Sequence, residues 1–243
     1  MNKTYTTLII AAAIIIASFI LINGYKYRFQ SAQTVSVVGK SEVDFESDLV
    51  VWEGSYVRKS ADLKSTYSSL KADELLIRGY LKEKGIPDSS IVFSAVNLEQ
   101  QFRTVYGTNG EAKDNIFAGY ALTQTVKIES KDLNRIEQLS REATELIEKG
   151  IELNSFPPRY YYTKLSNLKM DLLSKASADA QNRAFSITSS VNSSLGKLKK
   201  ADMGVFQITG RNSTEEYSYG GSYNTSERYK TASITIRMDY LLE

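Results

Sequence analysis

The chain has 243 residues and a formal net charge of +2, and it contains neither cysteine nor histidine. This composition excludes disulfides, thiol nucleophiles, serine-histidine triads and metal sites built on cysteine or histidine. The near-neutral charge disfavours a nucleic-acid partner, because phosphate binding requires a concentrated basic surface. We therefore expect no catalytic residue, no cofactor and no metal site.

An unbroken apolar run extends from Leu8 to Ile22, behind the basic residue Lys3. With the three residues before it, the run is long enough to cross a bilayer as a helix. A secretory signal has a similar core, but its cleavage requires small residues one and three positions before the cut. Ile22 occupies the second of these positions when Gly24 occupies the first. We therefore predict an uncleaved anchor, with a cleaved signal as the alternative.

Residues 1–30 are predicted to form this anchor or signal segment with a short spacer, and residues 31–243 to form one domain that faces outward. The side chains expected to contact the bilayer are Leu8, Ile9, Ile10, Ile14, Ile15, Ile16, Phe19, Ile20, Leu21 and Ile22.

The next residues alternate between apolar and polar, as in half-buried strands. Strands are predicted over 34–40 and 49–58, and Trp52 in the second is assigned to the core. Gly39 interrupts the first strand. A glycine there indicates a bulge or a close approach of two backbones.

A helix is predicted over 60–84, with Ser60 as its N-cap and Gly85 at its end. Asp73 and Glu74 interrupt its apolar stripe. Either could face the sheet, but buried unpaired carboxylates are costly. Both are therefore expected at the solvated margin of the stripe.

Strands are predicted over 91–105 and 116–128, joined by the polar connection 106–115, and a helix over 132–149. Gln124 interrupts the apolar face of the second of these strands. Its burial is therefore expected to be incomplete, or its amide to have a partner.

The chain twice follows the order strand, helix, Lys-Gly-Ile, strand, with the joints at Lys84–Ile86 and Lys149–Ile151. This pattern is typical of an internal duplication. Coincidence is the alternative, because a glycine commonly ends a helix.

A strand over 152–162 is predicted to be broken, or at a sheet edge, because it contains Pro157 and Pro158. The longest helix follows over 165–191. Its buried stripe is predicted to contain Leu165, Leu168, Leu172, Ala176, Ala180, Ala184, Ile187 and Val191. Small residues on successive turns let a helix lie close to a sheet. A bulky replacement at Ala180 should therefore cost more stability than one at Ser177.

The last strands are predicted over 203–209 and 232–240, and the second has the clearest alternation in the chain. Lys197, Lys199 and Lys200 are interpreted as a solvated cluster before the first of them.

The segment between these strands, 211–229, is too long and polar for a tight turn. It contains Tyr217, Tyr219, Tyr223 and Tyr229. Tyrosine supplies contact area at low entropic cost, so these residues are a candidate interface with a partner or a second copy. A flexible loop without a partner is the alternative.

The element order β-β-α-β-β-α-β-α-β-β predicts an α+β fold. We expect an antiparallel or mixed sheet packed by three helices, preceded by one transmembrane or signal helix.

Several short segments, taken in order, resemble the SIMPL-domain family. They are Val35–Gly39, Gly85–Ile86, Gly119–Tyr120, Gly150–Ile151, Lys175–Ala180 and Leu195–Gly196. The resemblance spans Thr34 to Leu242. It implies a bacterial cell-envelope protein, related to periplasmic immunogenic and outer-membrane-associated antigens, with no established catalytic residues. It also implies an envelope or oxidative stress role and homo-oligomers.

Our leading hypothesis is a non-enzymatic protein with a single pass in the inner membrane and a periplasmic domain that acts by self-assembly or binding. An exported periplasmic form after signal cleavage is the alternative location. The alternative functions are an envelope hydrolase using carboxylate or serine chemistry, and a carrier of small apolar ligands. Ser-x-x-Lys spacings at Ser68, Ser166 and Ser194 are interpreted as chance matches, because the companion motifs of that enzyme class are absent.

Overall fold

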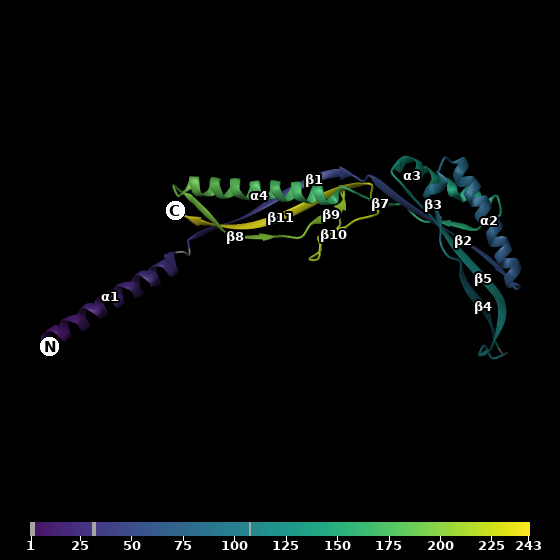
Figure 1. Ribbon diagram of the computed structural model, residues 1–243. Helices are drawn as coiled ribbons and strands as arrows, with labels where there is room; N and C mark the ends of the chain where they lie inside the picture. Colours follow the sequence, from purple (N-terminus) through teal and green to yellow (C-terminus); the bar gives the residue numbers. More distant parts are fainter. Residues whose placement is uncertain (1–2, 31–32, 107) are drawn as a thin grey trace.

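The computed structural model describes residues 3–30, 33–106 and 108–243. It has the predicted α+β class, with an N-terminal apolar helix, three further α-helices and two sheets. Figure 1 shows an elongated molecule in which helix α1 (Lys3–Gln30) projects from one end and the two sheets follow one another along the long axis. Within α1, the stretch Ile9–Lys26 is long and apolar enough to cross a membrane.

The sheet beside α1, with the helix that covers it, is called the proximal lobe. Its elements are β1 (Thr34–Glu46), α4 (Leu165–Ser190), β8 (Leu195–Met203), β9 (Gln207–Gly210), β10 (Ser222–Tyr223) and β11 (Tyr229–Leu242). Strand β11 is central: β1 pairs antiparallel with its whole length on one side, and β9 and β8 share its other side. This lobe has its own core, formed by alternate residues of β1 and β11 under one face of α4.

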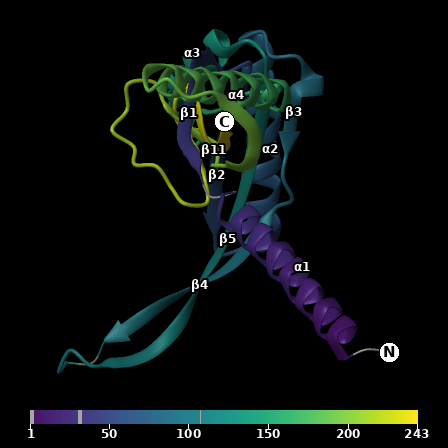
Figure 2. The ribbon, with the colours of Figure 1, turned by 90° about the vertical axis from the view of Figure 1, so that its left-hand side faces the viewer.

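The remaining elements form the distal lobe. They are β2 (Leu49–Ser60), α2 (Leu63–Glu83), the 3-10 turn η1 (Asp88–Ser90), β3 (Ile91–Phe93), β4 (Asn97–Tyr106), β5 (Ala112–Ser130), α3 (Leu133–Glu142), the 3-10 turn η2 (Ala143–Ile147), β6 (Leu153–Ser155) and β7 (Arg159–Tyr161). Helices α2 and α3 pack on a six-stranded sheet around a second core, which includes Trp52 as predicted. Figure 2 shows that β4 and β5 continue beyond the sheet as a long hairpin. The predicted boundary between residues 1–30 and 31–243 stays a prediction.

The two halves of the distal lobe begin their helices in the same way. Ser60 and Ser130 each accept a hydrogen bond from the backbone N–H two residues later, at 3.4 and 3.0 Å. The side chains of Asp62 and Asp132 then accept from the third residue of each helix segment, Ser65 and Arg135. The N-cap of α2 is thus Asp62, and the prediction of Ser60 was wrong by two residues because its hydroxyl orients the capping loop instead.

The two halves also end their helices alike. Gly85 and Gly150 have φ of 81° and 76°, values that L side chains rarely adopt, and the next N–H returns to the helix. Ile86 donates to the carbonyl of Leu81, and Ile151 to that of Leu146. β2 and β5 pair antiparallel along their lengths, so the two strand-helix-strand units lie about an approximate twofold axis. This symmetry favours the duplication interpretation.

Several boundaries differ from the sequence prediction. Residues 195–203 form strand β8, where the sequence analysis expected a solvated lysine cluster before the strand. The lysines of that segment are exposed because the strand lies at a sheet edge. The predicted strand 91–105 is two strands separated by residues 94–96, and α3 ends at Glu142 before continuing as η2. The proline pair at 157–158 separates β6 from β7, which confirms the predicted break.

Helix α4 buries a residue at every fourth position. These residues are Leu172, Ala176, Ala180, Ala184 and Thr188. Ile187 and Val191, predicted in the stripe, are instead 47% and 67% exposed. Thr188 replaces them, and its hydroxyl donates to the carbonyl of Ala184 at 3.1 Å, which satisfies its polar group in the core.

Replacement of Ala180 with leucine is expected to lower the free energy of unfolding by about 2–3 kcal/mol, because the added atoms would enter the contact between α4 and β1. Replacement of the exposed Ala178 with leucine is the matched control and should change it by less than about 0.5 kcal/mol. Chemical denaturation of both variants measures the difference. Equal stabilities would show that this face of α4 is not tightly packed.

Candidate functional site

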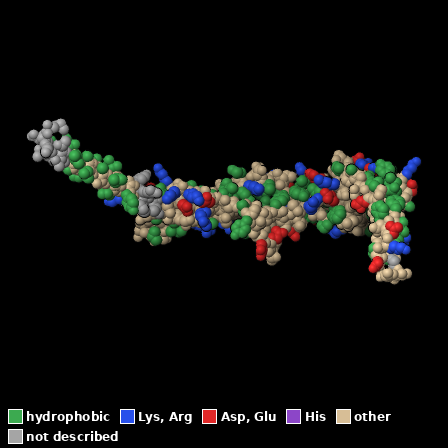
Figure 3. Space-filling model, turned by 90° about the horizontal axis from the view of Figure 1, so that it is seen from below, with side chains coloured by type: hydrophobic (Ala, Val, Ile, Leu, Met, Phe, Trp, Pro, Cys, Tyr) green, Lys and Arg blue, Asp and Glu red, His purple; other side chains and the backbone are tan. Residues whose placement is uncertain are grey.

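The predicted anchor residues lie on α1. From Ile9 to Ile22 they are exposed on all sides of the helix, while the side chain of Leu8 lies outside the described residues. Figure 3 shows apolar side chains along the described length of α1. A helix that is apolar all round requires apolar surroundings, so these residues fit a bilayer core.

The four tyrosines of the 211–229 segment lie in two separate regions, and all four are exposed. Tyr217 and Tyr219 lie together beside a groove of about 580 Å³. The groove floor contains Ser233 and Thr235 of β11, on the sheet face away from α4. The hydroxyl groups of Ser233 and Tyr217 are 3.4 Å apart.

Hydrogen bonds fasten this loop to the sheet. The side chain of Gln207 bonds both the N–H and the carbonyl of Ser218, and β10 pairs in parallel with β9. The described structure of this segment is therefore held against the sheet, and its tyrosines remain exposed. Its use as an interface stays a prediction.

The other two tyrosines lie near the junction between the lobes. The Tyr223 ring centroid is 5.4 Å from the Lys230 amine and 6.5 Å from the Tyr161 ring. Tyr229 lies between the guanidinium groups of Arg211 and Arg228, at 4.9 and 5.6 Å. The predicted tyrosine set thus forms no single cluster.

A buried lysine at this junction was missed by the sequence analysis. Lys230 on β11 is 0% exposed, and its amine donates to the backbone carbonyls of Tyr160 and Asn224, each at 2.6 Å. One side chain therefore joins the central strand of the proximal lobe to β7 of the distal lobe and to the tyrosine-rich segment.

Arg228 strengthens the same junction. Its guanidinium contacts Glu46 of β1 at 2.6 Å and Glu137 of α3 at 3.2 Å. Asp48, between β1 and β2, accepts from the N–H and the hydroxyl of Thr163, both at 2.7 Å. These contacts join the two lobes at the junction.

Burial lowers the pKa of Lys230 to about 8, although Glu215 and Glu227 partly oppose the shift. The unfolded chain, with a lysine pKa near 10.5, then binds more protons than the folded chain between about pH 8 and pH 10.5. The free energy of unfolding should therefore rise with pH across this window, by up to about 3 kcal/mol from this group.

Urea unfolding from pH 7.5 to pH 10.5 measures this rise. The Lys230→Met variant should lose it, while Lys175→Met, which removes an exposed lysine from α4, should keep it. An unchanged pH slope in Lys230→Met would contradict the assignment.

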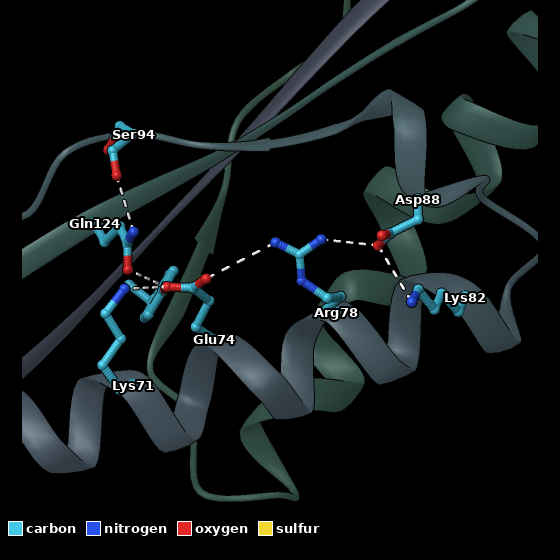
Figure 4. A network of polar contacts seen from close by, with 8 residues as sticks. Lys71, Glu74, Arg78, Lys82, Asp88, Ser94 and Gln124 are labelled. Carbon is cyan, nitrogen blue, oxygen red and sulfur yellow. Dashed lines mark hydrogen bonds and ion pairs between the residues drawn. The ribbon is translucent and has the colours of Figure 1, made fainter.

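A chain of charged groups runs along α2 in the distal lobe, shown in Figure 4. Lys71 pairs with Glu74 at 2.6 Å, Glu74 with Arg78 at 3.8 Å, and Arg78 with Asp88 at 2.8 Å. Lys82 also contacts Asp88, at 3.3 Å, so every carboxylate of the network is paired with two cations. Such surface pairs contribute little stability individually.

Two buried polar groups adjoin this chain. The Tyr56 hydroxyl donates to the Gln124 side-chain oxygen at 2.7 Å, and the Gln124 amide donates to the carbonyl of Ser94 at 2.8 Å (Figure 4). The predicted amide partner is thereby identified. Burial, followed by the nearby Glu74 and Asp73, raises the pKa of Tyr56, so the phenol is unsuited to act as a base.

Asp73 is buried, and its expected place at the solvated margin was wrong. Its carboxylate receives two hydrogen bonds from Arg58 of β2, at 2.5 and 2.7 Å. Arg58 also donates to the carbonyl of Gly150 at 2.9 Å. The ion-pair partner that stabilises the buried Asp73 carboxylate thus comes from another element. A local sequence pattern does not reveal such a partner. Glu74 is on the margin as expected.

The serine-lysine spacing at Ser68 has no catalytic geometry. The Ser68 hydroxyl donates to the carbonyl of Lys64, and the hydrogen bond to Glu74 raises the pKa of Lys71. A general-base lysine requires the opposite shift. Among the described residues, no group of acidic side chains is arranged to hold a metal ion.

The model of one protein family matches residues 35–239, which form nearly all of the two lobes. That family is described as SIMPL, proteins of unknown function (DUF541). No curated protein matches the chain. The match covers most of the 243 residues, and the chain therefore belongs to the SIMPL family.

Proposed function

We propose that the chain is a bacterial cell-envelope protein that is held in the inner membrane by α1 and acts by self-assembly or binding on the periplasmic side, without enzymatic activity. The observation that carries this proposal is α1 itself, an apolar helix that the lobes leave uncovered. A role in envelope or oxidative stress is part of the same proposal.

The lobes support a binding role through their surface. Large apolar side chains are exposed on the distal hairpin, on α4 and on β8, among them Phe102, Phe185 and Met203. On the hairpin, the exposed rings of Phe102 and Phe117 lie 6.0 Å apart, and contiguous apolar surface of this kind marks places that other molecules cover. The ion pairs of Asp73 with Arg58 and of Lys71 with Glu74 make these two groups unsuited to act as a general acid or base.

Membrane retention tests the tether. The full chain, expressed in a Gram-negative bacterium, should remain in the membrane fraction after an alkaline wash, and its N-terminal sequence should begin at or near Met1. Replacement of Ile15 and Phe19 with arginine should reduce retention, since each charge costs about 2.5–3.5 kcal/mol at the centre of a membrane helix. The control is Leu75→Arg, which places an arginine at an exposed position of α2. A mature protein that begins near Tyr25 would remove the tether.

Solution mass tests assembly. The full chain, purified in a mild detergent, should have a protein mass of at least twice 27.2 kDa by light scattering. A strict monomer at high protein concentration would overturn self-assembly and leave binding to another molecule.

A further inference from the structure

The outer sides of β1 and β8 are uncovered edges of the proximal sheet. Among the described strands, β1 pairs only with β11, and β8 also pairs only with β11, on its other side. An edge strand offers a row of backbone donors and acceptors to another strand. The sheet therefore ends at β1 on one side; on the other it ends at β8 along the C-terminal part of β11 and at β10 beyond β9.

The outer edge of β1 has a defined direction of hydrogen bonding. The N–H of Lys40 donates to the carboxylate of Asp179 at 2.9 Å, so it points away from β11. Backbone groups of an antiparallel strand alternate in direction, so the N–H groups of Ser36 and Val38 point outward as well. Between Lys40 and the anchor, β1 can thus accept another strand.

Helix α4 leans toward this edge. It packs mainly on β1 and β11 and hardly touches β8. A groove of about 600 Å³ lies between β1 and the outer side of α4, lined by Ser36, Val37 and Val38 of β1 and by Asn182, Arg183, Ser186 and Ile187 of α4. The apolar side chain of Ile187 borders it and is about half exposed.

The opposite edge of the sheet carries exposed apolar side chains that could fill this groove. Leu198 and Met203 of β8 lie opposite Tyr240 and Ile236 of β11, so they share the face on which α4 packs. Because α4 does not reach β8, Leu198 and Met203 are 50% and 59% exposed.

The strand directions and the membrane anchor are compatible with pairing between two copies of the chain. Both β1 and β8 run antiparallel to β11 and are therefore parallel to each other. Copies anchored through α1 in one membrane are related by a rotation about the membrane normal, which preserves this direction.

We infer that the proximal sheet continues from one copy to the next: β8 of one copy adds to the β1 edge of its neighbour, and its Leu198 and Met203 enter the groove beside Ile187. The contact joins two different surfaces, so repeated rotation about the membrane normal forms a ring when the rotation angle divides a full turn. This inference rests on the proposed self-assembly and names the surface that performs it.

Cysteine cross-linking tests the contact, since the chain has no cysteine of its own. Ile187→Cys and Leu198→Cys are placed in two full-length chains with different tags, which are mixed in detergent and treated with a short bismaleimide. The mixture should give a product carrying both tags, and each variant alone should give at least tenfold less. Leu75→Cys mixed with Leu198→Cys sets the background, because Leu75 is exposed on α2 of the other lobe. Cross-linking no greater than this background overturns the contact.

Association variants give a second measurement. Val38→Pro removes an outward N–H without breaking the ladder to β11, and Leu198→Asp places a charge in the groove. Each should weaken self-association at least tenfold in light scattering, with Leu75→Asp as the unchanged control. Circular dichroism checks that each variant is folded.

The outcomes separate this inference from the proposed function. A monomeric wild-type chain refutes self-assembly itself. A wild-type oligomer that survives both Val38→Pro and Leu198→Asp refutes only this surface. In intact cells, a cross-link from Ile187→Cys to another protein, with no product between copies, would assign the groove to that protein and overturn the inference.

Discussion

Replacement of Gly39 with alanine is expected to lower the free energy of unfolding by about 3 kcal/mol or more and to disrupt the proximal lobe. A Cβ atom at this position would lie 2.2 Å from the carbonyl oxygen of Ala176, 2.5 Å from the nitrogen of Ala180 and 2.7 Å from its Cβ. Two of these atoms belong to the α4 backbone. A side-chain rotation therefore cannot relieve the clash, and the whole helix must move away from β1.

Gly79 is the matched control for this change. It lies inside α2, and nothing is within 4 Å of the position a Cβ would take. Gly79→Ala should raise stability by about 0.5–1 kcal/mol, because alanine loses less entropy in a helix. The midpoints of thermal and urea unfolding should therefore fall in Gly39→Ala and rise in Gly79→Ala. A Gly39→Ala protein as stable as the wild type would show that α4 and β1 are further apart than described.

Replacement of Asp73 with alanine is expected to cost about 3–5 kcal/mol, the usual cost of breaking a buried ion pair. The Arg58 guanidinium, 35% exposed, would lose both of its carboxylate contacts while remaining against the sheet. The change should also loosen the joint after η2, because the same guanidinium holds the carbonyl of Gly150. Urea unfolding measures the total cost, and hydrogen exchange at Ile151 and Leu153 reports the local loosening.

The control is Glu74→Gln, which removes the neighbouring carboxylate from a surface pair and should cost less than about 1 kcal/mol. The double change Arg58→Met with Asp73→Leu should recover much of the loss, since apolar residues can replace a buried pair. If the Asp73→Ala and Glu74→Gln proteins unfold at the same urea concentration, the Arg58–Asp73 pair is solvated.

The sequence predicted the features that depend on local patterns. The alternation of β11, the small-residue stripe of α4 and the glycines that end α2 and η2 are periodicities or single positions, and the structure has each of them. The division of the strands into two sheets has no local signal, because strands in either sheet alternate in the same way. Edge strand β8 was missed for a related reason: its exposed lysines hide the pattern of a strand.

The candidate site shows the same limit. Lys230 stands in phase with Ala232, Ile234 and Ile236, so extending that alternation by two residues would have predicted its burial. Its carbonyl partners come from β7 and from the 211–229 segment, and no local rule identifies them. Asp73 was placed at the surface by a rule for unpaired carboxylates, and its partner is fifteen residues away on another element.

The length of β1 sets the distance between α1 and the distal lobe. Thirteen residues in extended conformation span about 40 Å, and the distal lobe begins only where this strand ends. With α1 in a bilayer as proposed and β1 upright on it, the hairpin of β4 and β5 would lie well outside the layer of lipid headgroups. Shortening β1 and β11 together by a few paired residues would lower the hairpin toward the lipid without altering its surface. The height of the hairpin can therefore be changed independently of its surface residues.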